Sequence, residues 1–198
     1  MAITGRTPDE CFDAFRSHVA SLVKKVVPGA YPVRCDSKGQ RRTLSFLNSR
    51  ADDAIPIETA DGGEVYLYMM QALTTVPVEN EKRKHRLKTV AYAYKLYGVR
   101  PDLTNIEALV RWEYTSVRRP NLKWCPNHVQ FGPLNGGSIR LPFGERAIDL
   151  KKMHLPTGWV LIEHVFRFLI HELGMKPPSA DWHDVLHESE DRFRQFTG

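Results

Sequence analysis

The chain has 198 residues and a formal net charge of +5 at pH 7, with 28 lysines and arginines against 23 aspartates and glutamates, and this length predicts one domain over residues 1–198. No run reaches the roughly 18 apolar residues that a membrane-spanning helix needs, and the first residues lack the apolar stretch of a signal peptide. Because the three cysteines are odd in number and lack metal-ligand spacing, we expect a cytoplasmic protein in a reducing compartment, with no membrane partner.

The chain is predicted to begin with an amphipathic helix. Thr7 is a typical N-cap residue, Pro8 suits the first helical position, and Glu10 completes a capping box. Pro28-Gly29 is expected to end the helix. Apolar residues follow helical spacing between these two signals, at Phe12, Phe15, Val19, Leu22, Val23 and Val26.

Residues 31–73 change to the two-residue alternation of strands. Turn residues at 36–39 precede one expected strand, Arg42 to Leu47, and turn residues at 60–63 precede another, Glu64 to Leu73. A further strand is expected over Thr89 to Tyr97, with Val90, Tyr92, Tyr94 and Leu96 on one face and Ala91 and Ala93 on the other.

A strand with one apolar and one charged face is predicted within residues 105–116. Val110, Trp112 and Tyr114 fall on one side, whereas Arg111 and Glu113 fall on the other. A second short strand, residues 128–131, is expected to pair with it in antiparallel fashion. This pairing would place His128 on the face of Arg111 and Glu113, within one strand spacing.

Two helices are predicted at the end of the chain. The first spans residues 159–173 and is expected to stop at Gly174, and the second spans residues 182–196 after Pro177-Pro178. Trp159, Phe166 and Trp182 are expected to be largely buried. The order of elements predicts an α+β fold, in which an N-terminal helix, an antiparallel sheet of hairpins and two C-terminal helices pack together.

Two histidine patterns on these helices do not fit the chemistry that they suggest. His183 and His187 are spaced like a metalloprotease helix, but Asp184 replaces the general-base glutamate, so we expect no metal and a solvated polar face that includes Glu190 and Arg194. The spacing of His164, Arg167 and His171 is shorter than that of HEPN ribonucleases. Glu163 and Arg167 are expected to form an ordinary ion pair between successive helical turns.

The polar residues of the strands are the candidate catalytic group. A metal-independent ribonuclease needs a base for the 2′-hydroxyl, an acid for the leaving oxygen and a cation for the phosphate. Glu113, His128 and Arg111 would supply these roles without a cofactor, and His154 stands near the last helices as a fourth candidate. The competing interpretation is that Arg111 and Glu113 form salt bridges on a solvated sheet.

Clustered basic residues, which we expect to lie in loops, are the candidate contacts to nucleic acid. Lysine and arginine clusters of this kind bind phosphate backbones, although they also serve solubility alone. The candidates are Lys82, Arg83, Lys84, Arg86, Arg118, Arg119 and Lys123.

Four segments carry a resemblance to known proteins: Tyr-Ala-Tyr-Lys-Leu, Leu-Val-Arg-Trp-Glu-Tyr, Pro-Asn-His-Val and His-Leu-Pro-Thr-Gly. With the apolar helix that follows, they make residues 88–196 resemble uncharacterised bacterial proteins whose element order is similar to the TumE-type toxins of toxin–antitoxin pairs. Such toxins often have two or more histidines where this chain has only His128 in its strand. The resemblance implies a bacterial toxin or antiviral-defence context, a nucleic-acid target and a cognate antitoxin or complex partner.

We therefore expect a small basic protein that binds or cleaves RNA, as a toxin-type endoribonuclease would. The competing hypothesis is a non-catalytic subunit that binds a protein or a nucleic acid within a larger complex.

Overall fold

The structure is a computed structural model that describes most of the chain. It covers residues 4–29, 31–46, 53–79, 81–98, 108–116, 126–132, 138–140, 147–149 and 154–197. Three helices occur in these ranges: α1 (Pro8–Val26), α2 (Ile162–Leu173) and α3 (Trp182–Thr197). The strands are β1 (Thr4–Gly5), β2 (Val33–Lys38), β3 (Arg41–Phe46), β4 (Ala54–Glu58), β5 (Glu64–Val78), β6 (Glu81–Tyr97), β7 (Val110–Thr115), β8 (Asn127–Phe131), β9 (Ser138–Arg140), β10 (Ala147–Asp149) and β11 (His154–Pro156).

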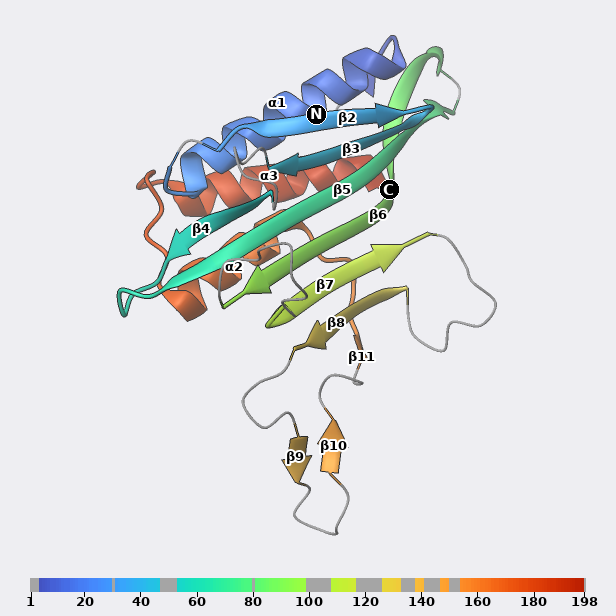
Figure 1. Cartoon of the computed structure of the whole chain (residues 1–198). Helices are drawn as coiled ribbons and strands as arrows, with labels where there is room; N and C mark the ends of the chain where they lie inside the picture. The colour runs from blue at the N-terminus through green and yellow to red at the C-terminus, as the bar shows by residue number, and fades with distance from the viewer. Residues whose placement is uncertain are drawn as a thin grey trace.

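Nine of these strands form one antiparallel sheet, which confirms the predicted α+β fold with an N-terminal helix and two C-terminal helices. The strand order is β11-β8-β7-β6-β5-β3-β2, while β1 pairs with the start of β6 and β4 pairs with β5. Strands β9 and β10 pair only with each other among the described strands. The long β5–β6 hairpin runs through the middle of the sheet (Figure 1).

The predicted start of α1 is confirmed. The Glu10 backbone N–H donates to Thr7 Oγ1 at 3.2 Å, and Pro8 occupies the first turn. The Glu10 carboxylate accepts a hydrogen bond from the Arg6 backbone N–H at 2.7 Å, one residue before the N-cap. The apolar stripe of α1 is buried, as its helical spacing requires.

All three helices lie on the same side of the sheet, behind the strands in Figure 1. The face that they cover carries Leu67, Met69 and Tyr94, each 0% exposed. Phe166 of α2 is also 0% exposed, as predicted, whereas Trp159 and Trp182 pack against the core but remain partly buried. The opposite face of the sheet, hereafter the open face, carries no described helix.

A β-bulge changes the predicted alternation of β6. Ala72 pairs with Ala91 but Leu73 pairs with Thr89, so Val90 is the extra residue. Tyr92 and Tyr94 face the core as predicted, but beyond the bulge it is Thr89 that is buried, rather than a residue in phase with Val90. Residues 81–88, which the sequence suggested as a basic loop, belong to β6 instead.

Helix α2 starts later than predicted and ends where predicted. It begins at Ile162 rather than residue 159, and it ends at Gly174, whose φ of 68° is left-handed. A Cβ on Gly174 would lie 2.4 Å from the Ala60 Cβ, so this position also needs glycine for space. The Ala60 backbone N–H donates to the Leu173 carbonyl at 2.9 Å, which ties the helix end to the turn after β4.

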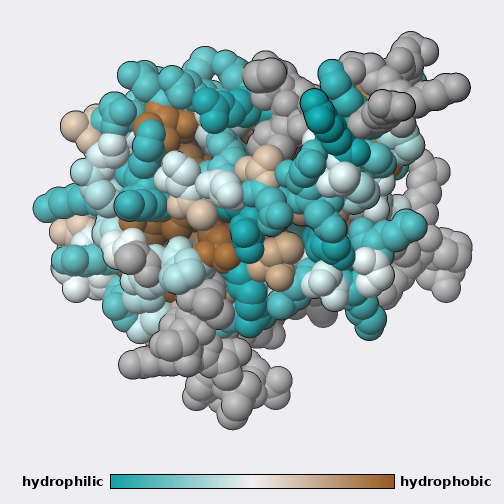
Figure 2. Space-filling model, turned by 90° about the horizontal axis from the view of Figure 1, so that it is seen from above, coloured by the Kyte–Doolittle hydropathy of each residue, from teal (hydrophilic) through white to brown (hydrophobic). Residues whose placement is uncertain are grey.

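Hydrophilic residues make up most of the surface seen from above, and hydrophobic residues appear there in separate patches (Figure 2). Among the described residues, no helix combines the length and the apolar character that crossing a membrane would require.

Candidate functional site

The register of β7 and β8 brings three of the four candidate catalytic residues to neighbouring positions. Glu113 lies directly opposite His128, and Arg111 lies opposite Gln130. Residues directly opposite each other in an antiparallel pair share a face, so Arg111, Glu113 and His128 lie on the open face. The predicted shared face and one-strand spacing are confirmed.

The fourth candidate, His154, lies on the next strand. Its backbone pairs with Gln130, and Pro156 pairs with His128. His154 therefore belongs to the row of Arg111 and Gln130 rather than to the row of Glu113 and His128.

A close approach of two backbones helps to fix the β7–β8 register. The Gly132 N–H donates to the Leu109 carbonyl at 2.8 Å, just beyond the ends of the two strands. A Cβ at Gly132 would lie 1.9 Å from the Ala108 carbonyl oxygen. Since no larger residue fits without moving the backbone, this glycine supports the pairing that places Glu113 opposite His128.

Glu113 lies between two basic side chains. One carboxylate oxygen, Oε2, lies 3.7 Å from His128 Nε2, and the other, Oε1, lies 3.7 Å from Lys95 Nζ on β6. The side chain of Glu113 is 28% exposed, whereas that of His128 is 7% exposed. A ligand on this face would therefore meet the Glu113 carboxylate first, with His128 beside and below it.

Lys95 extends the cluster across the sheet. It pairs with Tyr68 on β5 and with Arg111 on β7, and its Nζ lies 5.7 Å from the centroid of the Tyr68 ring. Together with Gln130 these residues form one row across four neighbouring strands, hereafter the open-face row (Tyr68, Lys95, Arg111 and Gln130).

Tyrosine rings border this row. Burial raises the pKa of Tyr97, which also responds to the nearby charges of Arg111 and Glu113, and burial likewise raises the pKa of Tyr68. Both phenols therefore stay neutral at physiological pH and can act as hydrogen-bond donors. Lys95 was not among the candidates predicted from the sequence, although it alternates with Tyr94 and so must face away from the core.

The basic candidates are not gathered at this site. β6 separates Arg86 from Lys95 by nine residues, or about 30 Å of extended strand. Lys82 and Arg83 lie in the first part of the same strand, where Lys84 is exposed and Arg86 is partly exposed. Arg118, Arg119 and Lys123 lie outside the described residues.

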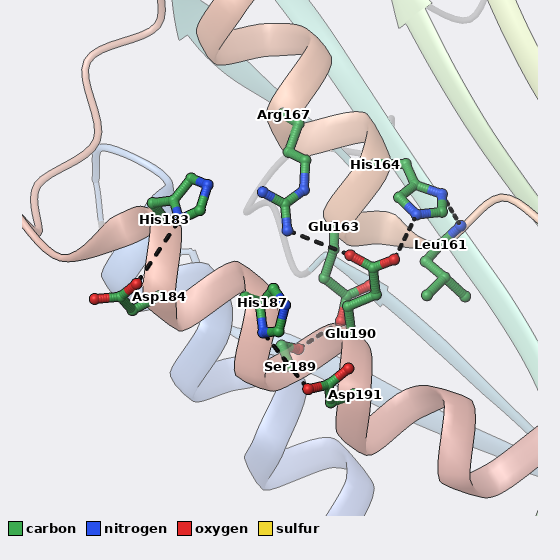
Figure 3. A network of polar contacts seen from close by, with 10 residues as sticks. All are labelled: Leu161, Glu163, His164, Arg167, His183, Asp184, His187, Ser189, Glu190 and Asp191. Carbon is green, nitrogen blue, oxygen red and sulfur yellow. Dashed lines mark hydrogen bonds and ion pairs between the residues drawn. The ribbon is translucent and has the colours of Figure 1, made fainter.

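A second polar network joins the helices under the other face (Figure 3). Ser189 of α3 donates a hydrogen bond to Glu163 Oε1 of α2, and Ser189 Oγ lies 2.9 Å from His18 Nε2 of α1. Glu163 is 1% exposed, and its Oε2 has no hydrogen-bond partner within the described structure. Burial raises the pKa of Glu163, an effect that the Ser189 hydrogen bond opposes, and burial lowers the pKa of His18.

Glu190 and Arg167 correct two predictions from the helical wheel. Glu190 is buried rather than solvated, because it contacts α2: its carboxylate lies 3.1 Å from His164 Nε2 and 3.3 Å from Arg167. Arg167 therefore pairs with Glu190 and not with Glu163. The Leu161 N–H donates to His164 Nδ1 at 3.3 Å, so the proton on Nε2 is the one that points at Glu190.

The two histidines of the metalloprotease-like spacing have acidic neighbours. His183 Nδ1 lies 3.7 Å from Asp184, and His187 Nδ1 lies 3.5 Å from Asp191, with all four side chains exposed. The predicted solvated face is therefore confirmed for His183 and His187, whereas Glu190 is buried. Among the described residues, no group of three histidine, cysteine or acidic side chains is arranged to hold a metal ion.

No protein-family model matches the chain, and searches of curated proteins and of solved structures found no significant match either. The resemblance to TumE-type toxins therefore stays a prediction.

Proposed function

We propose that the protein binds RNA across the open face of its sheet. The observation that carries the proposal is the open-face row, in which two cations, Lys95 and Arg111, stand between Tyr68 and Gln130 on the face that no described helix covers. Arginine recognises phosphate through its planar fork of donors, and tyrosine rings stack on unpaired bases. Single-stranded RNA presents phosphates and unpaired bases together.

Removing the two cations of the open-face row should weaken RNA binding and its salt dependence. Each phosphate contact on a single strand contributes about 0.7 to the slope of log K against log salt, so Lys95→Ala with Arg111→Ala should lower this slope by about 1.4. Fluorescence anisotropy with a labelled single-stranded RNA at several salt concentrations measures the slope. The matched control is Lys24→Ala with Lys176→Ala, which removes two exposed lysines elsewhere. Equal slopes in the two double variants would refute the proposal.

A second candidate function, metal-independent RNA cleavage, is favoured by the contact between Glu113 and His128. The partly exposed carboxylate of Glu113 suits the base that takes a 2′-hydroxyl proton, and Arg111 suits the phosphate. His128 would orient the carboxylate and, as the general acid, donate its own proton to the leaving 5′-oxygen, while Glu113 holds the proton taken from the 2′-hydroxyl. In this conformation His128 is 7% exposed, so the acid role requires that RNA binding bring the leaving oxygen to its edge.

Cleavage and binding are separated by one assay with RNA in EDTA, where metal-dependent nucleases are inactive. If the protein cleaves RNA, Glu113→Gln and His128→Ala should each lower the rate by about 10²–10⁴-fold, the range for a general acid or base. Thermal unfolding of each variant shows whether the fold is kept. Binding without cleavage by the wild type would support the non-catalytic subunit of a larger complex, and cleavage that survives Glu113→Gln would exclude the proposed base.

A further inference from the structure

A groove of about 620 Å³ lies on β6 far from the open-face row. It is lined by Arg86 and Lys88 of β6, by Tyr114 at the end of β7, and by Trp159 ahead of α2. β6 separates Lys88 from Lys95 by seven residues, or about 23 Å of strand. A groove of this size is within the usual range of about 300–1,000 Å³ for small-ligand sites.

The groove opens beside a part of β6 that none of the described strands pairs with on one side. β1 pairs with His85 and Arg86, and the register with β7 starts at Ala91, with one further backbone bond from Ser116 N–H to the Val90 carbonyl. Among the described strands, none pairs with residues 87–89 on this side. Within the described structure, the groove therefore reaches the unpaired backbone edge of β6.

The aromatic wall of the groove is held in place. The rings of Tyr114 and Trp159 lie with centroids 4.5 Å apart, and the Tyr92 ring lies 5.8 Å from Trp159. The Val160 N–H donates to the Tyr92 hydroxyl at 3.1 Å, and this hydroxyl donates to Asn127 Oδ1, also at 3.1 Å. The backbone next to Trp159 is therefore anchored to the sheet, which orders the indole before any ligand binds.

We propose that this groove binds a nucleotide, with its base on the Trp159 and Tyr114 rings and its phosphate at Lys88 and Arg86. Aromatic rings bind bases of any sequence, and basic side chains bind the phosphate. Glu79 also lines the groove, so the phosphate belongs at the Arg86 and Lys88 side. These two residues alternate with the buried Leu87 and Thr89, so their side chains leave β6 on the face opposite the rings. The nucleotide would therefore extend around the edge of β6 at residues 87–89. This site goes beyond RNA binding on the open face and does not depend on it.

The nucleotide can be free or part of an RNA strand, and the test uses both forms. Binding of AMP, of adenosine and of a short single-stranded oligoribonucleotide is measured by calorimetry. The wild type should bind AMP or the oligonucleotide, and Lys88→Ala should weaken that binding about tenfold, as expected for losing one charge-assisted hydrogen bond. Adenosine, which lacks the phosphate, should bind Lys88→Ala and the wild type equally.

Two further variants complete the test. Trp159→Ala should lower the affinity for every ligand that the wild type binds. Trp159→Phe, which keeps an aromatic ring, should retain most of that affinity. Lys24→Ala, an exposed lysine of α1, is the control for losing one charge. If AMP binds and its binding depends on Lys88, the ligand is a free nucleotide. If only the oligonucleotide binds, and its binding depends on Lys88 but not on Arg111, the ligand is part of an RNA strand. If neither ligand binds, or if Lys88→Ala and Trp159→Ala leave affinity unchanged, the proposal is wrong.

Discussion

Replacing Phe166 with alanine is expected to lower the free energy of unfolding by about 3–5 kcal/mol. The Phe166 side chain is 0% exposed and belongs to the core between the helices and the sheet. Its removal loses the transfer free energy of the ring and leaves a cavity that the long strands cannot close, because their backbones are fixed by neighbours on both sides. Urea denaturation followed by circular dichroism measures the change in the midpoint at constant slope.

Leu155→Ala is the matched control for Phe166→Ala. Leu155 is 39% exposed on β11, so its truncation should change stability by no more than about 0.5 kcal/mol. A loss below about 1 kcal/mol for Phe166→Ala, well under the range for such truncations, would show that α2 does not pack on the sheet through this residue.

The side of the sheet on which each candidate residue lies could be predicted, because a strand's period of two leaves few alternatives. Trp112 and Tyr114 face the core, so Arg111 and Glu113 must face away from it. The shared face of Glu113 and His128 followed from the same alternation and from the expected antiparallel pairing of the two strands, whereas the register that sets them directly opposite each other did not. Lys95 obeys the same rule, because it alternates with Tyr94 and Leu96, which are both buried.

The bulge at Val90 and the length of β6 could not be predicted in the same way. A bulge adds one residue to one strand and leaves no mark in local hydrophobicity, since its cause is the register with β5. Residues 81–88 are charged and therefore resemble a loop, but β5 supplies their backbone hydrogen bonds over most of this length. Strand pairing at a sheet edge tolerates charged side chains.

Glu163 and Glu190 show the limit of the helical wheel. Periodicity identifies the apolar stripe of a helix, but it does not tell which neighbouring helix covers the border of that stripe. Both glutamates lie at such borders, where α2 and α3 meet. The buried Ser189 in the stripe of α3 was the available signal, because a buried hydroxyl needs a partner.

Buried Glu163 should make stability depend on pH. Burial raises its pKa above the ordinary value of 4.5, so between the two values the folded state binds more protons than the unfolded chain. The contribution of this group to stability is therefore greatest below pH 4.5 and is lost as the pH rises through the folded-state pKa. His18 acts in the opposite direction: its lowered pKa removes stability as the pH falls below 6.5.

Ser189→Ala is expected to lower the free energy of unfolding by about 1–3 kcal/mol, and the loss should be larger at pH 8 than at pH 5. The change removes the hydroxyl that donates to Glu163 and accepts from His18. Without that donor the buried carboxylate has less to favour its charged form, so its ionisation at high pH costs more stability. Urea denaturation at the two pH values measures both quantities.

Glu163→Gln distinguishes the carboxylate from the packing around it. The glutamine keeps the shape but cannot ionise, so the rise of the Ser189→Ala loss with pH should disappear in the Glu163→Gln background. A loss that instead grows as the pH falls below 6.5 would belong to His18, which contacts the same hydroxyl. Glu172→Gln, which removes an exposed carboxylate from the same helix, should leave the pH dependence of the Ser189→Ala loss unchanged. A Ser189→Ala loss that grows with pH even in the Glu163→Gln background would place the titrating group elsewhere in the network.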